Sequence, residues 1–513
     1  MNGAQALMES LAASGVGVCF TNPGTSELHL LQALDEHPLV RGVSCLFEGV
    51  ATGAADGFGR LAPAPAGALL HQGAGLANGL ANLHNARRAH TPLVTLVGDA
   101  ATTRTALDGP LDSDVVALAR PMSAWVATAT GAADAAAAVR AATRPPGGPA
   151  TLVVPADVAW SPAGQSVPAK APHPVAAVAA EVLAATARVL RHGPDTALIL
   201  GGPALTARGL GAADRIARAT GASVITEAFP ARLPRGAGLP RTERLSGDPA
   251  AARTRLAGTR HVVLAGAARP VAAFAEPGSP GELLPETCAA TRLGAWEDDV
   301  VSALEALAEE LAPRTPVTPL EGRPATVPVT DRPLDGAVLA AVVAAALPED
   351  AVVVDESNTF GGVLSDALAT ARRHDLLTLC GFAIGQGLPL SIGAALACPE
   401  RPVLCLEADG SAMYTLSALW TQARESLDIT TVVLDNGGYA ILRRESRRLL
   451  GGGTTPSPLF DIRDPALDFV ALSEGMGVPA SRAATSGELT EQLTKALAEP
   501  GPHLIHATLP ALY

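Results

Sequence analysis

Short runs of apolar, often β-branched residues recur along the chain, and each run ends in a polar or glycine-containing turn. Two of them stand in the last third, where residues 403–407 run into an Ala-Asp-Gly-Ser turn (408–411) and residues 431–434 run into an Asp-Asn-Gly-Gly-Tyr turn (435–439). Runs of this kind are typical of buried parallel strands. Apolar residues at 413, 416, 419 and 420 recur at helical spacing and predict one helix between the two strands.

The order of strand, acidic turn, helix, strand and amide turn predicts a ligand site. It places Asp409 and Asn436 at the carboxyl ends of strands, where open α/β sheets bind their ligands. A carboxylate, an amide oxygen and a free backbone carbonyl are hard oxygen ligands that suit Mg²⁺ shared with phosphate oxygens. Gly410 allows a close approach to the backbone, and Ser411 begins a helix whose N-terminus attracts anions.

The first third repeats this pattern with different chemistry at the strand ends. An apolar run at residues 15–20 leads into a turn and a helix start with hydroxyl caps at Thr25 and Ser26. Glu48 follows another apolar run and opens a helix rich in small residues, so its carboxyl is partly desolvated and keeps a proton available. His71 ends a third strand, and a glycine-rich turn at residues 73–75 leads into the next helix. Histidine is the side chain that titrates near neutrality.

Two proline-rich stretches divide the chain into three α/β domains. They cover residues 160–174 and 313–333, and each precedes a predicted helix, at residues 176–190 and 334–346. The predicted domains are therefore residues 1–160, 176–312 and 334–513. The middle domain opens with a strand and a glycine turn at residues 197–203, but it lacks the GxGxxG spacing of a dinucleotide site.

Composition narrows the class of protein. The 513 residues carry a formal net charge of −13 and no basic cluster, which argues against a nucleic-acid partner. The six cysteines have no CxxC or zinc spacing, the N-terminus has no signal-peptide pattern, and no uninterrupted apolar run of about 20 residues occurs. We expect free thiols in a reducing compartment, a cytoplasmic protein and no membrane partner.

These motifs resemble those of thiamine-diphosphate-dependent enzymes. The family signature Gly-Asp-Gly, followed about one helix later by Asn-Asn, reads here as Ala408-Asp409-Gly410 and Asp435-Asn436, with alanine and aspartate as the two departures. The resemblance covers nearly the whole chain and is closest to benzoylformate decarboxylases and acetolactate synthase large subunits. The family run Glu-x-x-Ala-x-x-x-Ala-Asp-Gly-x-x-Arg is matched in step by Glu48, Ala51, Ala55, Asp56, Gly57 and Arg60.

The resemblance implies a fold, two cofactors and a set of site residues. The fold is three domains, each an open, largely parallel sheet flanked by helices, as in pyruvate decarboxylase and acetolactate synthase, and the cofactors are thiamine diphosphate and Mg²⁺. Glu48 hydrogen-bonds the aminopyrimidine ring, while Asp409, Asn436 and the carbonyl of Gly438 hold the metal. Ile384 supports the bent shape of the cofactor. The further implied cofactor contacts are Asn78, Asn358, Thr359, Gly410, Ser411 and Tyr439.

The resemblance also implies a substrate pocket. Thr25 stands where the decarboxylase has a serine that contacts the substrate carboxylate, and His71 stands at its first catalytic histidine. The matching middle-domain stretch, residues 270–278, lacks the second catalytic histidine, and its Glu276 is not an assured substitute. The implied pocket residues are Thr25, Ser26, His71, Ile441, Leu442 and Glu445. Because Glu445 stands where an aromatic residue would favour benzoylformate, an aryl substrate is disfavoured.

The predicted function is thiamine-diphosphate- and Mg²⁺-dependent, non-oxidative decarboxylation of a 2-oxo acid, with or without carboligation to a second carbonyl compound. Three alternatives stay open: an acetolactate-synthase-type carboligase acting on pyruvate, a 2-hydroxyacyl-CoA lyase and a non-catalytic homologue. FAD in the middle domain is not expected, although acetolactate synthases bind a flavin there. The family further implies a homodimer or homotetramer with active sites at subunit interfaces, so that Glu48 and Asp409 of one site come from different chains.

Overall fold

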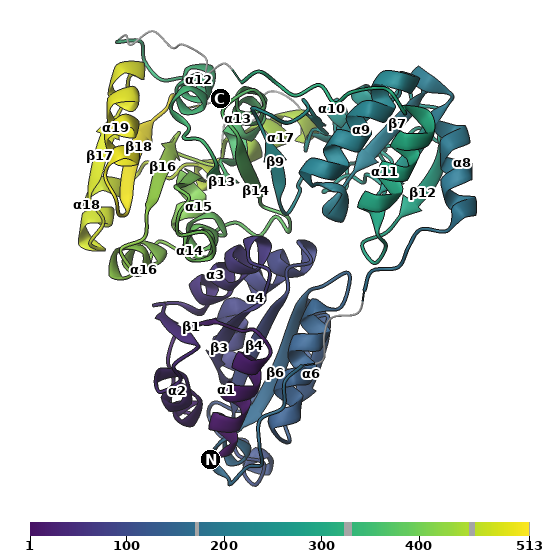
Figure 1. Cartoon of the computed structure of the whole chain (residues 1–513). Coiled ribbons are helices and arrows are strands. Elements are labelled where there is room, and N and C mark those ends of the chain that lie inside the picture. Colours follow the sequence, from purple (N-terminus) through teal and green to yellow (C-terminus); the bar gives the residue numbers. More distant parts are fainter. Residues whose placement is uncertain (170–173, 323–330, 451–456, 512–513) are drawn as a thin grey trace.

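The strands in the described part of the chain form three separate sheets. The computed structural model describes residues 1–169, 174–322, 331–450 and 457–511. Sheets of six, five and seven strands follow one another along the chain, and helices flank each of them (Figure 1). The pairings are parallel except between β9 and β14. The predicted α/β class with largely parallel sheets is therefore confirmed.

The N-terminal unit contains the six-stranded sheet, in the order β2-β1-β3-β4-β6-β5. Its strands are β1 (Val18–Thr21), β2 (Arg41–Ser44), β3 (Ala66–His71), β4 (Leu93–Asp99), β5 (Trp125–Thr128) and β6 (Pro149–Pro155). Its helices are α1 (Gly3–Ala13), α2 (Leu28–Asp35), α3 (Glu48–Leu61), α4 (Gln72–Arg88), α5 (Val115–Ala119), α6 (Ala132–Thr143) and α7 (Ala156–Trp160), with 3₁₀ turns η1 (Thr105–Leu107) and η2 (Arg120–Met122).

The middle unit contains the five-stranded sheet, in the order β10-β8-β7-β11-β12. Its strands are β7 (Thr196–Leu200), β8 (Ser223–Thr226), β10 (Glu243–Arg244), β11 (His261–Ala265) and β12 (Ala289–Gly294). Its helices are α8 (Ala180–Leu190), α9 (Ala207–Thr220), α10 (Pro249–Leu256) and α11 (Val300–Leu311), with 3₁₀ turns η3 (Gly193–Asp195) and η4 (Gly202–Ala204). Strand β9 (Leu233–Arg235) leaves this unit and pairs antiparallel with β14 of the third sheet.

The C-terminal unit contains the seven-stranded sheet, in the order β17-β18-β16-β15-β13-β14-β9. Its own strands are β13 (Ala351–Glu356), β14 (His374–Thr378), β15 (Val403–Ala408), β16 (Ile429–Asp435), β17 (Ala480–Ala483) and β18 (His503–Thr508). Its helices are α12 (Gly336–Ala346), α13 (Gly361–Leu368), α14 (Gly387–Ala397), α15 (Asp409–Ala412), α16 (Ala418–Arg424), α17 (Ala440–Leu450), α18 (Phe469–Gly475) and α19 (Ser486–Ala498), with 3₁₀ turns η5 (Asn358–Phe360) and η6 (Pro458–Phe460).

Two local predictions are corrected by these elements. The glycine-rich turn predicted at residues 73–75 is wrong, because α4 begins directly after β3 and contains these glycines. The single helix predicted over residues 413–420 is two short helices, α15 and α16, separated by residues 413–417. Within the middle stretch, residues 233–235 complete the C-terminal sheet. The domain boundaries themselves stay predictions.

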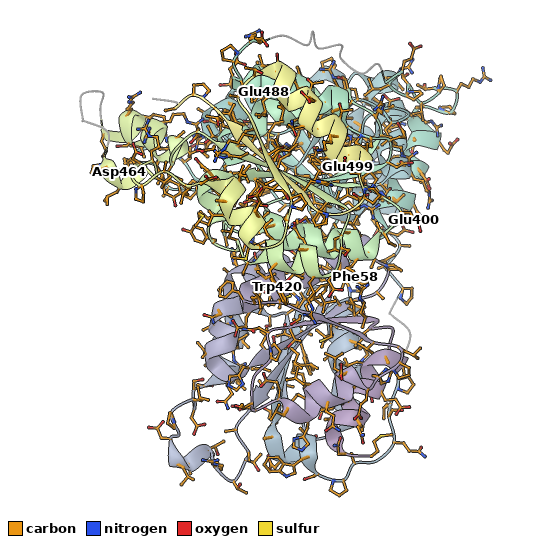
Figure 2. The ribbon with its side chains drawn as sticks, turned by 90° about the vertical axis from the view of Figure 1, so that its left-hand side faces the viewer. Phe58, Glu400, Trp420, Asp464, Glu488 and Glu499 are labelled. Atoms are coloured by element: carbon orange, nitrogen blue, oxygen red, sulfur yellow. The ribbon has the colours of Figure 1, made fainter. Side chains whose placement is uncertain are left out.

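The three units share their hydrophobic cores. One buried cluster runs from Val43 and Leu70 of the N-terminal sheet to Val354 and Val433 of the C-terminal sheet, and a second joins the middle unit to the C-terminal unit. Phe58 on α3 packs against the first of these clusters, and it lies where the N-terminal and C-terminal units meet (Figure 2). None of the helices in the described ranges combines the length and apolarity needed to cross a bilayer.

Helices α3 and α14 cross in this shared core, and their backbones touch because glycines stand at the crossing (Figure 1). A Cβ atom added at Gly393 would lie 1.9 Å from the carbonyl oxygen of Ala54, and one added at Gly57 would lie 2.0 Å from that of Leu390. A side chain at either position therefore requires the helices to separate.

We expect Gly393→Ala to lower the free energy of unfolding by about 1–3 kcal/mol. The added methyl group would meet the backbone carbonyl of Ala54, which cannot rotate away as a side chain could. The matched control is Gly475→Ala at the end of α18, where an added Cβ meets nothing within 4 Å. Thermal and denaturant unfolding of both variants provides the measurement. Equal stability of the two variants would contradict a close backbone contact between α3 and α14.

Candidate active site

The three predicted metal ligands lie together at the carboxyl edge of the C-terminal sheet. Strands β15 and β16 pair Ala408 with Leu434, so the residues that follow leave the sheet at the same level. One carboxylate oxygen of Asp409, Oδ2, accepts hydrogen bonds from the backbone N–H groups of Asn436 (3.2 Å), Gly437 (2.8 Å) and Gly438 (3.2 Å). The Oδ1 atom of Asn436 accepts the N–H of Gly438 at 3.2 Å.

Burial controls the charge at this edge. Asp409 is 3 % exposed, and burial, followed by the nearby Asp435 carboxylate, raises its pKa to about 7. Burial alone would also raise the pKa of Asp435, but its hydrogen bond with His506 lowers it. The Nε2 atom of His506 on β18 lies 2.7 Å from Oδ2 of Asp435. Asp435, which departs from the family signature, therefore has its own partner, His506, on the neighbouring strand β18.

The donor set of this cluster fits magnesium. It offers a carboxylate, an amide oxygen and a backbone carbonyl, all of which are hard oxygen ligands. Within the described ranges, no group of three histidine, cysteine, aspartate or glutamate side chains is arranged to hold a metal ion. The arrangement therefore suits a cation that completes its coordination with phosphate oxygens and water better than one that needs imidazole or thiolate ligands.

Four predicted cofactor contacts lie beside this cluster. Asn358, which has a φ of 47° after β13, donates from Nδ2 to Oγ of Ser411 at 2.8 Å. The ring of Tyr439 lies against Gly410, where an added Cβ would be 2.7 Å from its Cε1 atom. Because all four groups flank Asp409, they form one polar wall suited to an anionic phosphate group. Thr359 follows Asn358 in η5.

Ile384 lies in a loop that is held from two sides. From the N-terminal unit, Asn85 donates to the carbonyl of Ala383 at 2.8 Å, and Asn82 donates to the carbonyl of Gly385 at 3.3 Å. From β13, the carboxylate of Glu356 accepts the N–H groups of residues 385 (2.7 Å), 386 (2.7 Å) and 387. Burial raises the pKa of Glu356 to about 7, against the effect of these three donors.

The N-terminal unit carries a second cluster at the carboxyl edge of its own sheet. Glu48 begins α3, is 7 % exposed and accepts a hydrogen bond from Nδ2 of Asn78 at 3.0 Å. His71 ends β3, and its Nδ1 atom lies 2.8 Å from Oε2 of Glu27. Glu48 and His71 both lie beside Gly75. A Cβ added at Gly75 would be 3.1 Å from Oε1 of Glu48 and 3.3 Å from Cβ of His71.

A cavity of about 340 Å³ opens beside this second cluster. Ser26 and Gln72 line it on one side, and residues of the 99–112 segment, including Arg104, line the other. Gln72 donates to Oγ of Ser26, has a φ of 49° and is 5 % exposed. Thr25 lies exposed in the turn before Ser26.

The predicted pocket residues of α17 lie in the C-terminal unit. Ile441 is half-buried and Leu442 is exposed. Glu445 is held by Arg448, 2.6 Å away, and the same guanidinium binds Glu276 of the middle unit at 2.8 and 3.0 Å. The stretch that lacks the second histidine is therefore connected to α17 through Arg448.

The structure thus gathers the predicted residues into two clusters. The first contains Asp409, Gly410, Ser411, Asn358, Asn436, Gly438 and Tyr439, and the second contains Glu48, His71 and Asn78 with Ser26 nearby. In the described part of the chain, no hydrogen bond or ion pair joins Glu48 to Asp409.

The sequence interpretation missed four polar residues that bind predicted site residues or the segments that carry them: Glu27, Gln72, Glu356 and Arg448. Glu356 ends an apolar strand in the same way as the residues before Asp409, so its position contained a usable signal. Glu27 and Arg448 bind residues that are distant in the sequence, and Gln72 is placed by an unusual backbone angle. None of these features is visible in the local sequence pattern.

Two family models of known proteins match parts of the chain. Residues 1–118 match the family described as thiamine pyrophosphate enzyme, N-terminal TPP binding domain, and residues 361–507 match the corresponding C-terminal TPP binding domain. A Mycobacterium tuberculosis protein with the provisional description acetolactate synthase large subunit IlvX is 52 % identical over the full length of both chains.

Two further relatives are decarboxylases. Benzoylformate decarboxylase from Pseudomonas aeruginosa is 30 % identical over 97 % of each chain. The solved structure of a thiamine diphosphate-dependent 4-hydroxybenzoylformate decarboxylase from Rhodococcus jostii RHA1 superimposes with a TM-score of 0.85 at 28 % identity and covers 99 % of each chain.

We expect Glu356→Gln to weaken cofactor binding about tenfold or more, because an amide cannot serve three converging N–H donors as a carboxylate does. Quenching of tryptophan fluorescence during titration with thiamine diphosphate measures the affinity. The matched control is Glu349→Gln, an exposed residue just before the same strand. Equal affinity in both variants would exclude a role for Glu356 in holding the Ile384 loop for the cofactor.

Proposed function

Because the chain belongs to the thiamine pyrophosphate enzyme family, we propose that it catalyses the non-oxidative decarboxylation of a 2-oxo acid with thiamine diphosphate and Mg²⁺. The observation that carries this proposal is the pair of clusters at two sheet edges, each within a unit that matches a TPP-binding domain. The bound cofactor would supply the electron-accepting ring that makes loss of CO₂ feasible. The protein supplies position, charge and protons.

We assign the residues of the two clusters to separate tasks. Asp409, Asn436 and the carbonyl of Gly438 would hold Mg²⁺, and Asn358 with Ser411 would bind phosphate oxygens. Glu48 would exchange a proton with the aminopyrimidine ring, and Asn78 would orient its carboxyl. Thr25 and Ser26 would bind the substrate carboxylate, and His71 would move protons at the substrate.

An acetolactate-synthase-type carboligase is the second candidate, and the 52 % identical relative favours it. A flavin does not fit the middle unit well. In an open sheet a diphosphate would bind near β7, where the N–H of Gly202 already donates to the half-buried carboxyl of Glu227 at 2.9 Å. The indole ring of Trp296 covers the same glycine. These contacts support a carboligase or decarboxylase that works without FAD.

We further propose a dimer that brings the two clusters together across the subunit interface. Both clusters are flanked by exposed apolar side chains. Leu28 (57 %) and Leu46 (50 %) lie near the N-terminal cluster, and Tyr414 (56 %), Met413 (40 %) and Leu442 (46 %) lie near the C-terminal one. Apolar surface around an incomplete site is typical of an interface.

The first experiment measures CO₂ release from a panel of aliphatic and aryl 2-oxo acids with thiamine diphosphate and Mg²⁺ present. We expect release by the wild type, and we expect Glu48→Gln to lower it by roughly 10²- to 10⁴-fold, because the amide cannot exchange a proton. Glu9→Gln, exposed on α1, is the matched control. Product analysis separates an aldehyde from acetolactate or another carboligation product.

Two outcomes would contradict the proposal. Substantial activity of Glu48→Gln would remove this carboxyl from the mechanism. Cofactor binding without CO₂ release from any acid would favour a 2-hydroxyacyl-CoA lyase or a non-catalytic homologue.

The raised pKa of Asp409 predicts that Mg²⁺ binding depends on pH. A pKa of about 7 means that the folded protein holds this proton up to about pH 7, and a cation must displace it. We expect the affinity for Mg²⁺ to fall by up to roughly tenfold for each pH unit below about 7 and to change little above it. Calorimetric titration at pH 6, 7 and 8, with thiamine diphosphate saturating, measures this. An affinity that is constant from pH 6 to 8 would contradict it.

A further inference from the structure

Glu27 is a buried carboxyl that the tasks assigned above leave unused. It stands at the residue before α2, where an acidic side chain commonly caps the helix, yet its side chain makes no capping hydrogen bond. The side chain turns inward instead and is 0 % exposed. A carboxyl that is shielded from water and does not cap the helix requires another hydrogen-bond partner.

That partner is His71. Oε2 of Glu27 lies 2.8 Å from Nδ1 of the imidazole, and Oε1 has no hydrogen-bond partner among the described residues. The fold keeps space for this pair with two glycines. A Cβ added at Gly24 would lie 2.3 Å from Nδ1 of His71 and 2.6 Å from Oε1 of Glu27, and one added at Gly98 would lie 2.7 Å from Cβ of Glu27. The pair is thus enclosed by the ends of β1, β3 and β4.

We propose that Glu27 is a positioning residue that fixes the ring and the tautomer of His71. With the ionised carboxylate accepting the Nδ1–H, the Nε2 atom carries the lone pair and is the nitrogen presented toward the substrate. This inference rests on the proposed function, because it deepens the role given there to His71.

The groups around the pair support a single hydrogen-bonded arrangement. Glu48 and His71 both lie beside Gly75, Gln72 and Ser26 are neutral, and Asp99 follows Gly98 on β4. Among the charged side chains around Glu27 in the described part of the chain, His71 is thus the one that can stabilise its carboxylate. Burial raises the pKa of Glu27, and the hydrogen bond and charge of His71 act in the opposite direction. The carboxylate and the imidazole are therefore mutually dependent.

The kinetic test is a double-mutant cycle of Glu27→Gln and His71→Ala. Glutamine keeps the shape of the side chain but presents an amide that either accepts from or donates to Nδ1, so the tautomer is no longer defined. We expect Glu27→Gln to lower kcat roughly 10- to 100-fold with little change in thiamine diphosphate affinity. In the His71→Ala background the same substitution should change kcat less than about twofold. An equal loss in both backgrounds would show that Glu27 does not act through His71.

Glu36→Gln, exposed at the end of the same helix, is the matched control and should leave kcat unchanged. Unfolding temperatures of all variants show whether a loss of activity is a loss of folded protein.

A second readout needs neither turnover nor a Glu27 variant. In ¹⁵N-histidine-labelled wild type, the signals of His71 are identified among the eleven histidines by their absence in His71→Ala. We expect nitrogen shifts of the Nδ1–H tautomer near neutral pH. The Nε2–H tautomer would overturn the inference. Because this readout does not require CO₂ release, it separates failure of the inference from failure of the proposed decarboxylase activity.

Discussion

The direct backbone contact between α3 and α14 is the constraint on which the arrangement of both clusters depends. Glu48 opens one of these helices and the Ile384 loop leads into the other, so the crossing fixes where each cluster faces. A buried ion pair within α3 also reaches the C-terminal unit. Arg60 binds Asp56 at 2.7 and 2.9 Å and reaches the carbonyl of Thr378 at 2.7 Å. Because Arg60 and Asp56 both lie on α3, their ion pair would survive a separation of the two units, but the buried guanidinium would lose the carbonyl of Thr378.

Buried carboxyls hold the functional loops of both units. Glu356 gathers three backbone N–H groups at the start of α14, Asp409 gathers three at the turn after β16, and Glu27 holds an imidazole at the end of β3. In each case a strand or helix end supplies the carboxyl and a different segment supplies the donors. Since a buried carboxylate without donors is costly, each loop is held in one conformation by the need to satisfy that charge.

The sequence predicted those parts of the site that depend on local pattern. Apolar strands ending in polar turns located Asp409, Asn436, Glu48 and His71, because parallel strands bring their carboxyl ends to one edge. The features that the sequence pattern did not predict depend on contacts between segments that are distant in the sequence. Strand β9 pairs across a unit boundary, and the residues between α15 and α16 break a helix that spacing alone predicted as continuous. The local pattern around Glu27 predicts only a helix start, because its partner is 44 positions away.

The two departures from the family signature are structurally accommodated, which bears on the non-catalytic alternative. Ala408 has φ −75° and ψ 146°, an extended conformation that any residue adopts, so a glycine is not required there. Asp435 adds a negative charge beside Asp409, but His506 accompanies it at 2.7 Å, and Arg482 lies 3.1 Å from the other nitrogen of that ring. A site that had lost its ligand would have no reason to keep an added, half-buried charge compensated. The aspartate, its histidine and that arginine instead form a network that leaves the oxygen ligands of Asp409 and Asn436 together.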